Sequence, residues 1–364
     1  MAGFGFTPDN PDDDENKGRP DFSEIFKQFS GMGLNLQSLM ASLSGQTTPS
    51  ALSKEMIRVI SKKFLTAHGE IPVGVKDLVA SQEALSIADI WINDVTSFPP
   101  LPIPDTCALS RRDWIDSTLA GWEEIAKPLV EGMSQAMTTM LNENLGEGQE
   151  NFEIPGLPIP GLSIPGMNIP KSAIASVLGT FMSSLISTQL GQTIGQLSTT
   201  VTGSNDVALP LAEPIRPQLI PQNVALWGQG LEIDETEIRI YLALREIAAA
   251  RLFASTPWLR DYIRHSIATY GKGIRVDISA MTQQAEDAIS SGELDPSNPE
   301  SMTLALSGGM FTPEETPAQR AALEKIETVL ALIEGWIDAI VTIAAKDRLP
   351  SLVKLRETQQ RMRA

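Results

Sequence analysis

Residues 235–258, ETEIRIYLALREIAAARLFASTPW, decide the fold class of this chain. They combine strong helix formers with an acidic first turn, and these features predict one long helix. Asp234 precedes the run as a candidate N-cap, and Pro257 ends it. One side of this helix collects residues at helical spacing: Leu242, Glu246, Ala249, Ala250 and Phe253. Glu246 is the charged member of that set, so it needs a cation, a hydrogen-bond donor or a metal as its partner.

Helical patterns recur along most of the chain. The predicted helices cover residues 49–67, 72–91, 110–145, 171–201, 262–271, 279–290 and 317–345. In the second of these we expect the following core positions: Val75, Leu78, Val79, Leu85, Ile87, Ile90 and Trp91. Proline-rich residues 98–104 and 209–221 are expected to be extended connectors. The sequence therefore predicts a mainly α, multi-helix protein with proline-rich connectors.

The predicted helix of residues 171–201 carries small side chains at every fourth position. They are Gly179, Ser183, Ser187, Gly191 and Gly195. Glycine lowers helix stability by roughly 1 kcal/mol relative to alanine, so a close approach by another helix is the simplest reason for this stripe. Glutamines at 189, 192 and 196 argue against insertion of this helix into a membrane.

Composition divides the chain into four regions. Residues 1–49 form an acidic head that we expect to be disordered, and within it residues 22–43 are either a short amphipathic helix or a mobile tether. Residues 50–150 form an N-terminal helical region. Residues 151–170 form an Ile-Pro-Gly linker, and residues 171–364 form a C-terminal helical region.

Charge and composition exclude several classes of protein. A formal net charge of −17 argues against nucleic-acid binding, because the phosphate backbone would repel the chain. One cysteine, Cys107, excludes an intramolecular disulfide and fits a reducing compartment. The N-terminus lacks the pattern of a signal peptide, and no apolar run reaches about 18 residues, so we expect no membrane span and a cytoplasmic location. The sequence does not indicate an oligomeric state.

The chain has two histidines, His68 and His265. Zinc sites and general-base catalysis both rely on imidazole. Two isolated histidines do not make a histidine-rich metal site, so we interpret each as a solvated or hydrogen-bonded residue.

Residues 245–253, REIAAARLF, followed by residues 256–260, TPWLR, resemble the signature helix of the type 2 zincin-like metallopeptidases of actinobacteria. That family is also described as hydrolases or as coenzyme F420 biosynthesis-associated proteins, and its signature reads REAAHxRLF…HVPWLR. The resemblance implies a zincin-like helical fold. It also implies that the histidine positions of the signature are occupied here by Ala249, Ala250 and Ser255.

A second signature of the family resembles residues 330–341, LALIEGWIDAIV. For intact members the resemblance implies a zinc ion, with Glu246 activating or orienting water and Glu334 completing the ligand set. Asp338 follows Glu334 at i+4 and can face the same point. Three carboxylates without nitrogen ligands suit a hard cation better than zinc. Alternatively, nothing binds and the carboxylates pair with arginines, for which the candidates are Arg245, Arg251 and Arg260.

The resemblance and its missing histidines together suggest a catalytically impaired member of the family, a pseudoenzyme without a cofactor. The alternative is a non-enzymatic interaction or scaffold protein that binds a protein partner through residues 22–43 or 152–170. The sequence contains no G-x-S-x-G elbow and no Cys-His pair that would indicate a hydrolase without zinc.

Overall fold

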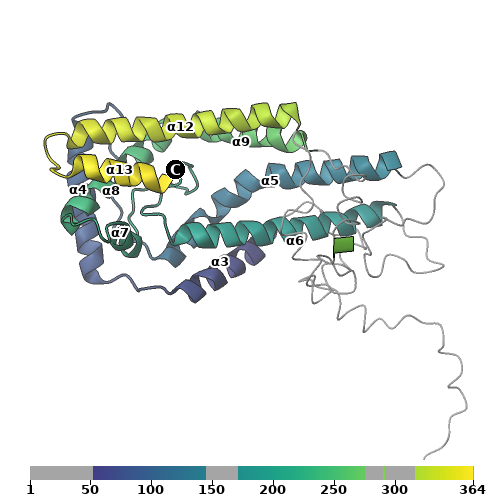
Figure 1. The fold of residues 1–364 in the computed structure, drawn as a ribbon, viewed down its shortest axis with the longest axis horizontal. Helices are drawn as coiled ribbons and strands as arrows, with labels where there is room; N and C mark the ends of the chain where they lie inside the picture. The colour runs from purple at the N-terminus through teal and green to yellow at the C-terminus, as the bar shows by residue number, and fades with distance from the viewer. Residues whose placement is uncertain (1–51, 145–170, 275–289, 292–315, 364) are drawn as a thin grey trace, which may run out of the picture.

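The computed structural model describes residues 52–144, 171–274, 290–291 and 316–363 (Figure 1). Within these ranges the chain is mainly α, as predicted, and its β pairing is limited to isolated bridges. The helices are α3 (Lys54–His68), α4 (Val75–Asn93), α5 (Arg111–Asn144), α6 (Lys171–Ser198), α7 (Pro221–Trp227), α8 (Glu235–Ser255), α9 (Trp258–Lys272), α12 (Pro317–Ala345) and α13 (Leu352–Arg363).

Several predictions concern other parts of the chain. The acidic head of residues 1–49, the linker of residues 151–170 and most of the predicted helix of residues 279–290 lie outside the described residues. The division into four regions therefore stays a prediction.

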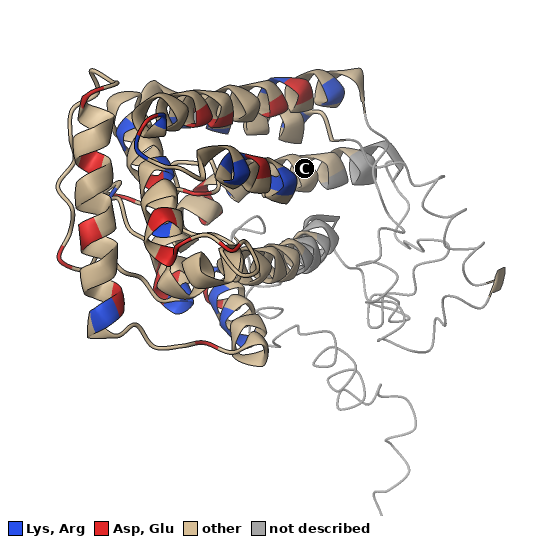
Figure 2. Cartoon of the chain, turned by 60° about the vertical axis from the view of Figure 1, so that its left-hand side comes forward, with Lys and Arg blue, Asp and Glu red and all other residues tan. Residues whose placement is uncertain are grey.

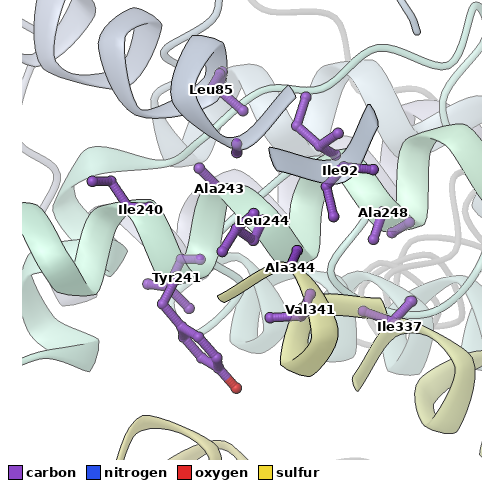
Figure 3. Packing of buried hydrophobic residues seen from close by; sticks show 14 of the residues in the cluster. Leu85, Ile92, Ile240, Tyr241, Ala243, Leu244, Ala248, Ile337, Val341 and Ala344 are labelled. Carbon is purple, nitrogen blue, oxygen red and sulfur yellow. The ribbon is translucent and has the colours of Figure 1, made fainter. Parts of the chain in front are cut away.

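Helix α8 lies at the centre of the molecule. Asp234 caps it by accepting a hydrogen bond from the Thr236 N–H, as predicted. Every residue from Ile240 to Phe253 is buried, so the helix is enclosed on all sides rather than amphipathic. Figure 3 shows α8 between α4 and α12, with alanines and branched aliphatic side chains filling the two contacts.

Helix α4 packs through small side chains, which corrects one prediction. Val75, Val79 and Ile90 are exposed, with Val75 retaining 79% of its surface. Leu85 is buried, as predicted, and Leu78, Ile87 and Trp91 are partly buried against the core. The other buried residues of α4 are Ser81, Ala84, Ala88 and Ile92. Because Ala84 and Ala88 are small, the α4 backbone can pack close to the alanine-rich α8.

A second core lies where α3, α5 and α6 meet. Added Cβ atoms at Gly191 and Gly195 would lie 2.9 Å from the Ile60 Cβ and 2.8 Å from the Phe64 Cβ of α3. The Ser61 hydroxyl also donates a hydrogen bond to the Gly191 carbonyl, at 2.9 Å. The predicted close approach of another helix to this stripe is confirmed, and the approaching helix is α3.

Helix α12 packs against α9, α8 and α4 (Figure 1). Among the described helices it alone is long and apolar enough, by length and composition, to cross a membrane. Core helices of soluble proteins can be equally long and apolar, so this property is weak evidence for a membrane span. Its inward face, which includes Ile333, Ile337 and Val341, belongs to the central core.

Candidate functional site

Helix α8 holds Glu246 against the loop that joins α6 to α7. Glu246 Oε1 accepts hydrogen bonds from the Asn205 side-chain amide at 2.7 Å and from the Gln218 N–H at 3.0 Å. Its Oε2 accepts from the Asn205 N–H, also at 3.0 Å. A side chain at Gly203 would overlap Glu246 Oε2, so this loop reaches the carboxylate only with glycine at that position. The loop therefore supplies the donors that a buried carboxylate requires.

The environment of Glu246 shifts its pKa strongly. Burial raises the pKa to about 8, because a charged carboxylate loses its hydration there. The hydrogen bonds from Gln218 and Asn205 act in the opposite direction, and the charge on Asp206 raises the pKa further. A large fraction of Glu246 is therefore protonated at neutral pH, unlike an ordinary glutamate.

Glu334 of α12 pairs with Arg245 of α8. Burial lowers the pKa of Arg245, but the charge on Glu334 and other neighbouring groups outweighs burial, so the net shift is upward. The Arg363 Nε lies 3.8 Å from Glu334 Oε1 and is a second cationic neighbour. Glu334 thus has the guanidinium partner that the metal-free alternative requires.

Helix α13 returns across this region with a row of basic residues (Figure 2). Arg356 binds Asp338 in a bidentate manner, with distances of 3.1 Å from Nε and 2.6 Å from Nη2. The hydrogen bond to Asp338 raises the pKa of Arg356. Arg363 donates to the Asp206 carbonyl at 2.5 Å and to its carboxylate at 2.6 Å. The basic end of the chain therefore contacts the acidic groups around α8 and α12.

These side chains surround a small pocket. It is lined by Thr202, Asn205, Asp206, Leu242, Arg245, Glu246, Ala249, Glu334 and Ile337. Its volume of about 10 Å³ is near the minimum that holds one water molecule. Two of the three predicted site carboxylates, Glu246 and Glu334, line this pocket together, beside Ala249.

The other predicted residues lie outside this lining. Asp338 is held by Arg356, Ala250 is buried, and Ser255 is half-buried at the end of α8. In the described ranges no group of three or more His, Cys, Asp and Glu side chains is arranged to hold a metal ion. His68 and His265 are both exposed.

Of the three arginines predicted as partners, Arg245 is the one that pairs with a predicted site carboxylate. Arg251 pairs instead with Asp89 of α4, and Arg260 pairs with Glu213. The sequence did not identify five further residues around the site, which are Asn205, Asp206, Gln218, Arg356 and Arg363. For Arg356 and Arg363 the sequence offered one indication, the basic tail of residues 356–363. It offered none for the loop residues Asn205, Asp206 and Gln218.

The model of the zincin-like metallopeptidase family matches residues 60–364. The chain belongs to this family. One solved structure, described as "a putative hydrolase with a novel fold" from Chloroflexus aurantiacus, is 15% identical over 83% of this chain and 81% of that chain, with a TM-score of 0.40. No curated protein matches the sequence.

The family implies zinc, and the side chains present do not fit that metal. Zinc in proteins is bound mainly by Cys sulfur and His nitrogen, with carboxylates as additional ligands. The positions that the family resemblance gives to histidine hold Ala249 and Ala250, which have no donor atom, and Ser255, which lies outside the pocket lining. Glu246, Glu334 and Asp338 are already bonded to protein groups.

Proposed function

We propose that this member of the family binds no zinc and has no peptidase activity. The observation that supports the proposal is the bonding of its three candidate carboxylates. Glu246 accepts three hydrogen bonds from the loop, Glu334 pairs with Arg245, and Asp338 pairs with Arg356. A metal would have to displace these partners and would find no nitrogen ligand beside them.

The chemistry of a zinc peptidase also needs room. Such an enzyme keeps an open coordination position and lowers the pKa of bound water to about 7. The pocket beside Ala249 has space for about one water molecule. Its wall includes the pair of Arg245 and Glu334, and the space beside Glu246 is too small for a peptide substrate. The retained scaffold therefore favours a role other than hydrolysis.

Metal content of the natively purified full-length protein, measured by mass spectrometry, tests this proposal. We expect far less than one zinc per chain and no cleavage of a peptide library. The variant Ala249→His offers the pocket a nitrogen ligand, and we expect it to gain zinc. Ala250→His is the matched control, because Ala250 is buried on the same helix but does not line the pocket. One zinc per wild-type chain together with peptide cleavage would show that the proposal is wrong.

A second candidate is an interaction or scaffold role in the cytoplasm. Exposed apolar side chains near the start of α4 and on α7 support it, because Ile71, Val75 and Leu226 are each at least half exposed. The Ile71 N–H donates to the Gln222 side chain, so the segment that precedes α4 contacts α7, the helix that carries Leu226. Affinity purification of the full-length protein, and of a form without residues 1–49, tests this role. Absence of a stoichiometric partner in both would argue against it.

A further inference from the structure

Helix α12 has apolar surface that its contacts with the other described helices do not cover. Its inward face, with Ile333, Ile337 and Val341, is buried in the central core, and the helix lies along the upper edge of Figure 1. Only 33% of its most apolar stretch is buried. Leu332 and Ile343 keep 67% and 61% of their surface exposed. The outward face of α12 is therefore a candidate contact surface.

The outward face of α12 reads the same in both directions from its middle. An α-helix turns by about 100° per residue, so residues at spacings of three, four, seven and eleven share a face. The residues that share the outward face are Glu324, Thr328, Ala331, Gly335, Ala339, Thr342 and Lys346. Six of these seven are exposed, and Thr342 is half-buried. From position 328 to position 343 no exposed residue of the helix is charged.

Charge of opposite sign marks the two ends of this face. Glu324 and Lys346 lie equally far from Gly335 along the chain, and both side chains are exposed. In an antiparallel pair of α12 helices with the two-fold axis at Gly335, Glu324 of each copy faces Lys346 of the other. A parallel pair would instead place each of these charges opposite its own kind, which is unfavourable. The face is therefore complementary to itself in one orientation.

Size favours the same arrangement. The antiparallel pair places Ala331 of one copy against Ala339 of the other, on both sides of Gly335. An added Cβ at Gly335 meets no atom within 4 Å in the single chain, so nothing in that chain fills the space above it. Small side chains let two helix backbones approach closely, and Leu332 and Ile343 then lie together on one side of the contact.

We propose that two copies of this chain associate through the outward face of α12, with the two helices antiparallel and Gly335 at the two-fold axis. The contact buries the exposed apolar surface of Leu332 and Ile343 and forms the pair of Glu324 and Lys346 twice. One helix pair is a small interface, so we expect a dissociation constant on the order of micromolar. This inference goes beyond the proposed function and holds whether or not the chain binds zinc.

Sedimentation equilibrium of the full-length protein tests the inference. At about 0.15 M salt the net charge of −17 is screened beyond about 8 Å, and we expect a monomer–dimer equilibrium. Gly335→Arg places a long charged side chain at the centre of the contact and should weaken dimerisation by at least about tenfold. Ile90→Arg is the matched control, because it adds the same charge at a 63% exposed position of α4 and should dimerise like the wild type. Gly335→Ala should also dimerise, because alanine already occupies the neighbouring turns of this face.

Exchange of the two end charges tests the antiparallel orientation. Glu324→Lys and Lys346→Glu each create two like-charge pairs across the contact, so each should weaken dimerisation by about fivefold. The double variant Glu324→Lys with Lys346→Glu should restore the wild-type affinity, because both pairs re-form with their signs reversed. Glu324→Lys also reduces the negative net charge of the chain, so an effect of net charge alone would strengthen association instead.

Three results would overturn the inference. They are a wild type that stays monomeric at every concentration, a Gly335→Arg variant that dimerises as well as the Ile90→Arg control, and a double charge variant no tighter than the single ones. If circular dichroism shows that Gly335→Arg is unfolded, the charge variants decide, because they change exposed side chains at the ends of the face.

Discussion

Two helix contacts in this molecule are built from opposite kinds of residue. Helix α3 meets α6 over Gly191 and Gly195, where the absence of side chains lets the helices approach. Helix α8 meets α12 and α4 through buried arginines, with Arg245 paired with Glu334 and Arg251 paired with Asp89. The first contact depends on shape, and the second depends on pairing each charge.

The two kinds of contact therefore respond to different substitutions and conditions. A contact made by glycines responds to added volume and is indifferent to pH. A contact made by buried charges responds to loss of a partner and to protonation. Since α8 belongs to the central core, its charged contacts are expected to have the larger influence on stability.

The largest effect is expected from Arg251→Met, which breaks the charged contact between α8 and α4. Arg251 is 1% exposed, pairs with Asp89, and donates to the carbonyls of Asp89 and Phe98 at 3.1 Å and 3.3 Å. Removing one partner of a buried pair typically costs about 3–5 kcal/mol, because the other partner stays unpaired. Urea unfolding of the variant should show a loss of that size.

Arg348→Met is the control for this variant. Arg348 also pairs with an aspartate at the C-terminal end of α4, Asp94, but both side chains are largely exposed. Exposed pairs contribute about 0–1 kcal/mol. A loss for Arg251→Met no larger than that of the control would show that the charged contact is not what holds α4 to α8.

The second prediction concerns how the stability of the folded protein depends on pH through Glu246. Its pKa is about 8 in the folded protein, against an ordinary value of 4.5. Between these values the folded state holds a proton that the unfolded state has released, so the contribution of Glu246 to stability falls as pH rises. The expected decrease is about 1.4 kcal/mol per pH unit within that window, with no further change above the folded pKa.

Denaturant unfolding from about pH 5 to about pH 9 measures this slope. Wild type and Glu246→Gln are compared, because other carboxylates contribute equally to both curves. Parallel curves would contradict the prediction. Infrared spectra of the wild type give a second readout that needs no variant, since a protonated buried carboxyl should lose its band as pH rises past the folded pKa.

The sequence predicted the shape-dependent contact better than the charged one. The stripe that contains Gly191 and Gly195 is local, and its spacing alone indicates a helix surface without side chains. The bounds predicted for α12, residues 317–345, also match the structure, because Pro317 and a continuous apolar stripe mark them. Both signals lie within a single element.

The charged contacts depend on residues far apart in the chain. Nothing near Glu246 in the sequence identifies Asn205 and Gln218 as its donors, because their loop becomes a partner only once the chain has folded. Three of the core positions predicted for α4, Val75, Val79 and Ile90, were wrong for a related reason. Hydrophobicity favours Val75 over Ala84, but the alanine-rich surface of α8 selects the small side chain.

The smallest effect is expected from Gly195→Ala, which tests the contact between α3 and α6 that depends on shape. The new methyl group would lie 2.8 Å from the Phe64 Cβ, and overpacking of this kind costs about 1–3 kcal/mol. The higher helix propensity of alanine offsets about 1 kcal/mol of this cost, so the net loss should be about 1 kcal/mol.

Gly335→Ala on α12 is the control, because no atom lies within 4 Å of its added methyl group. That variant should gain about 1 kcal/mol from propensity alone. Thermal unfolding should therefore move in opposite directions for the two substitutions, and a stabilised Gly195→Ala would mean that α3 can shift away from α6 at little cost.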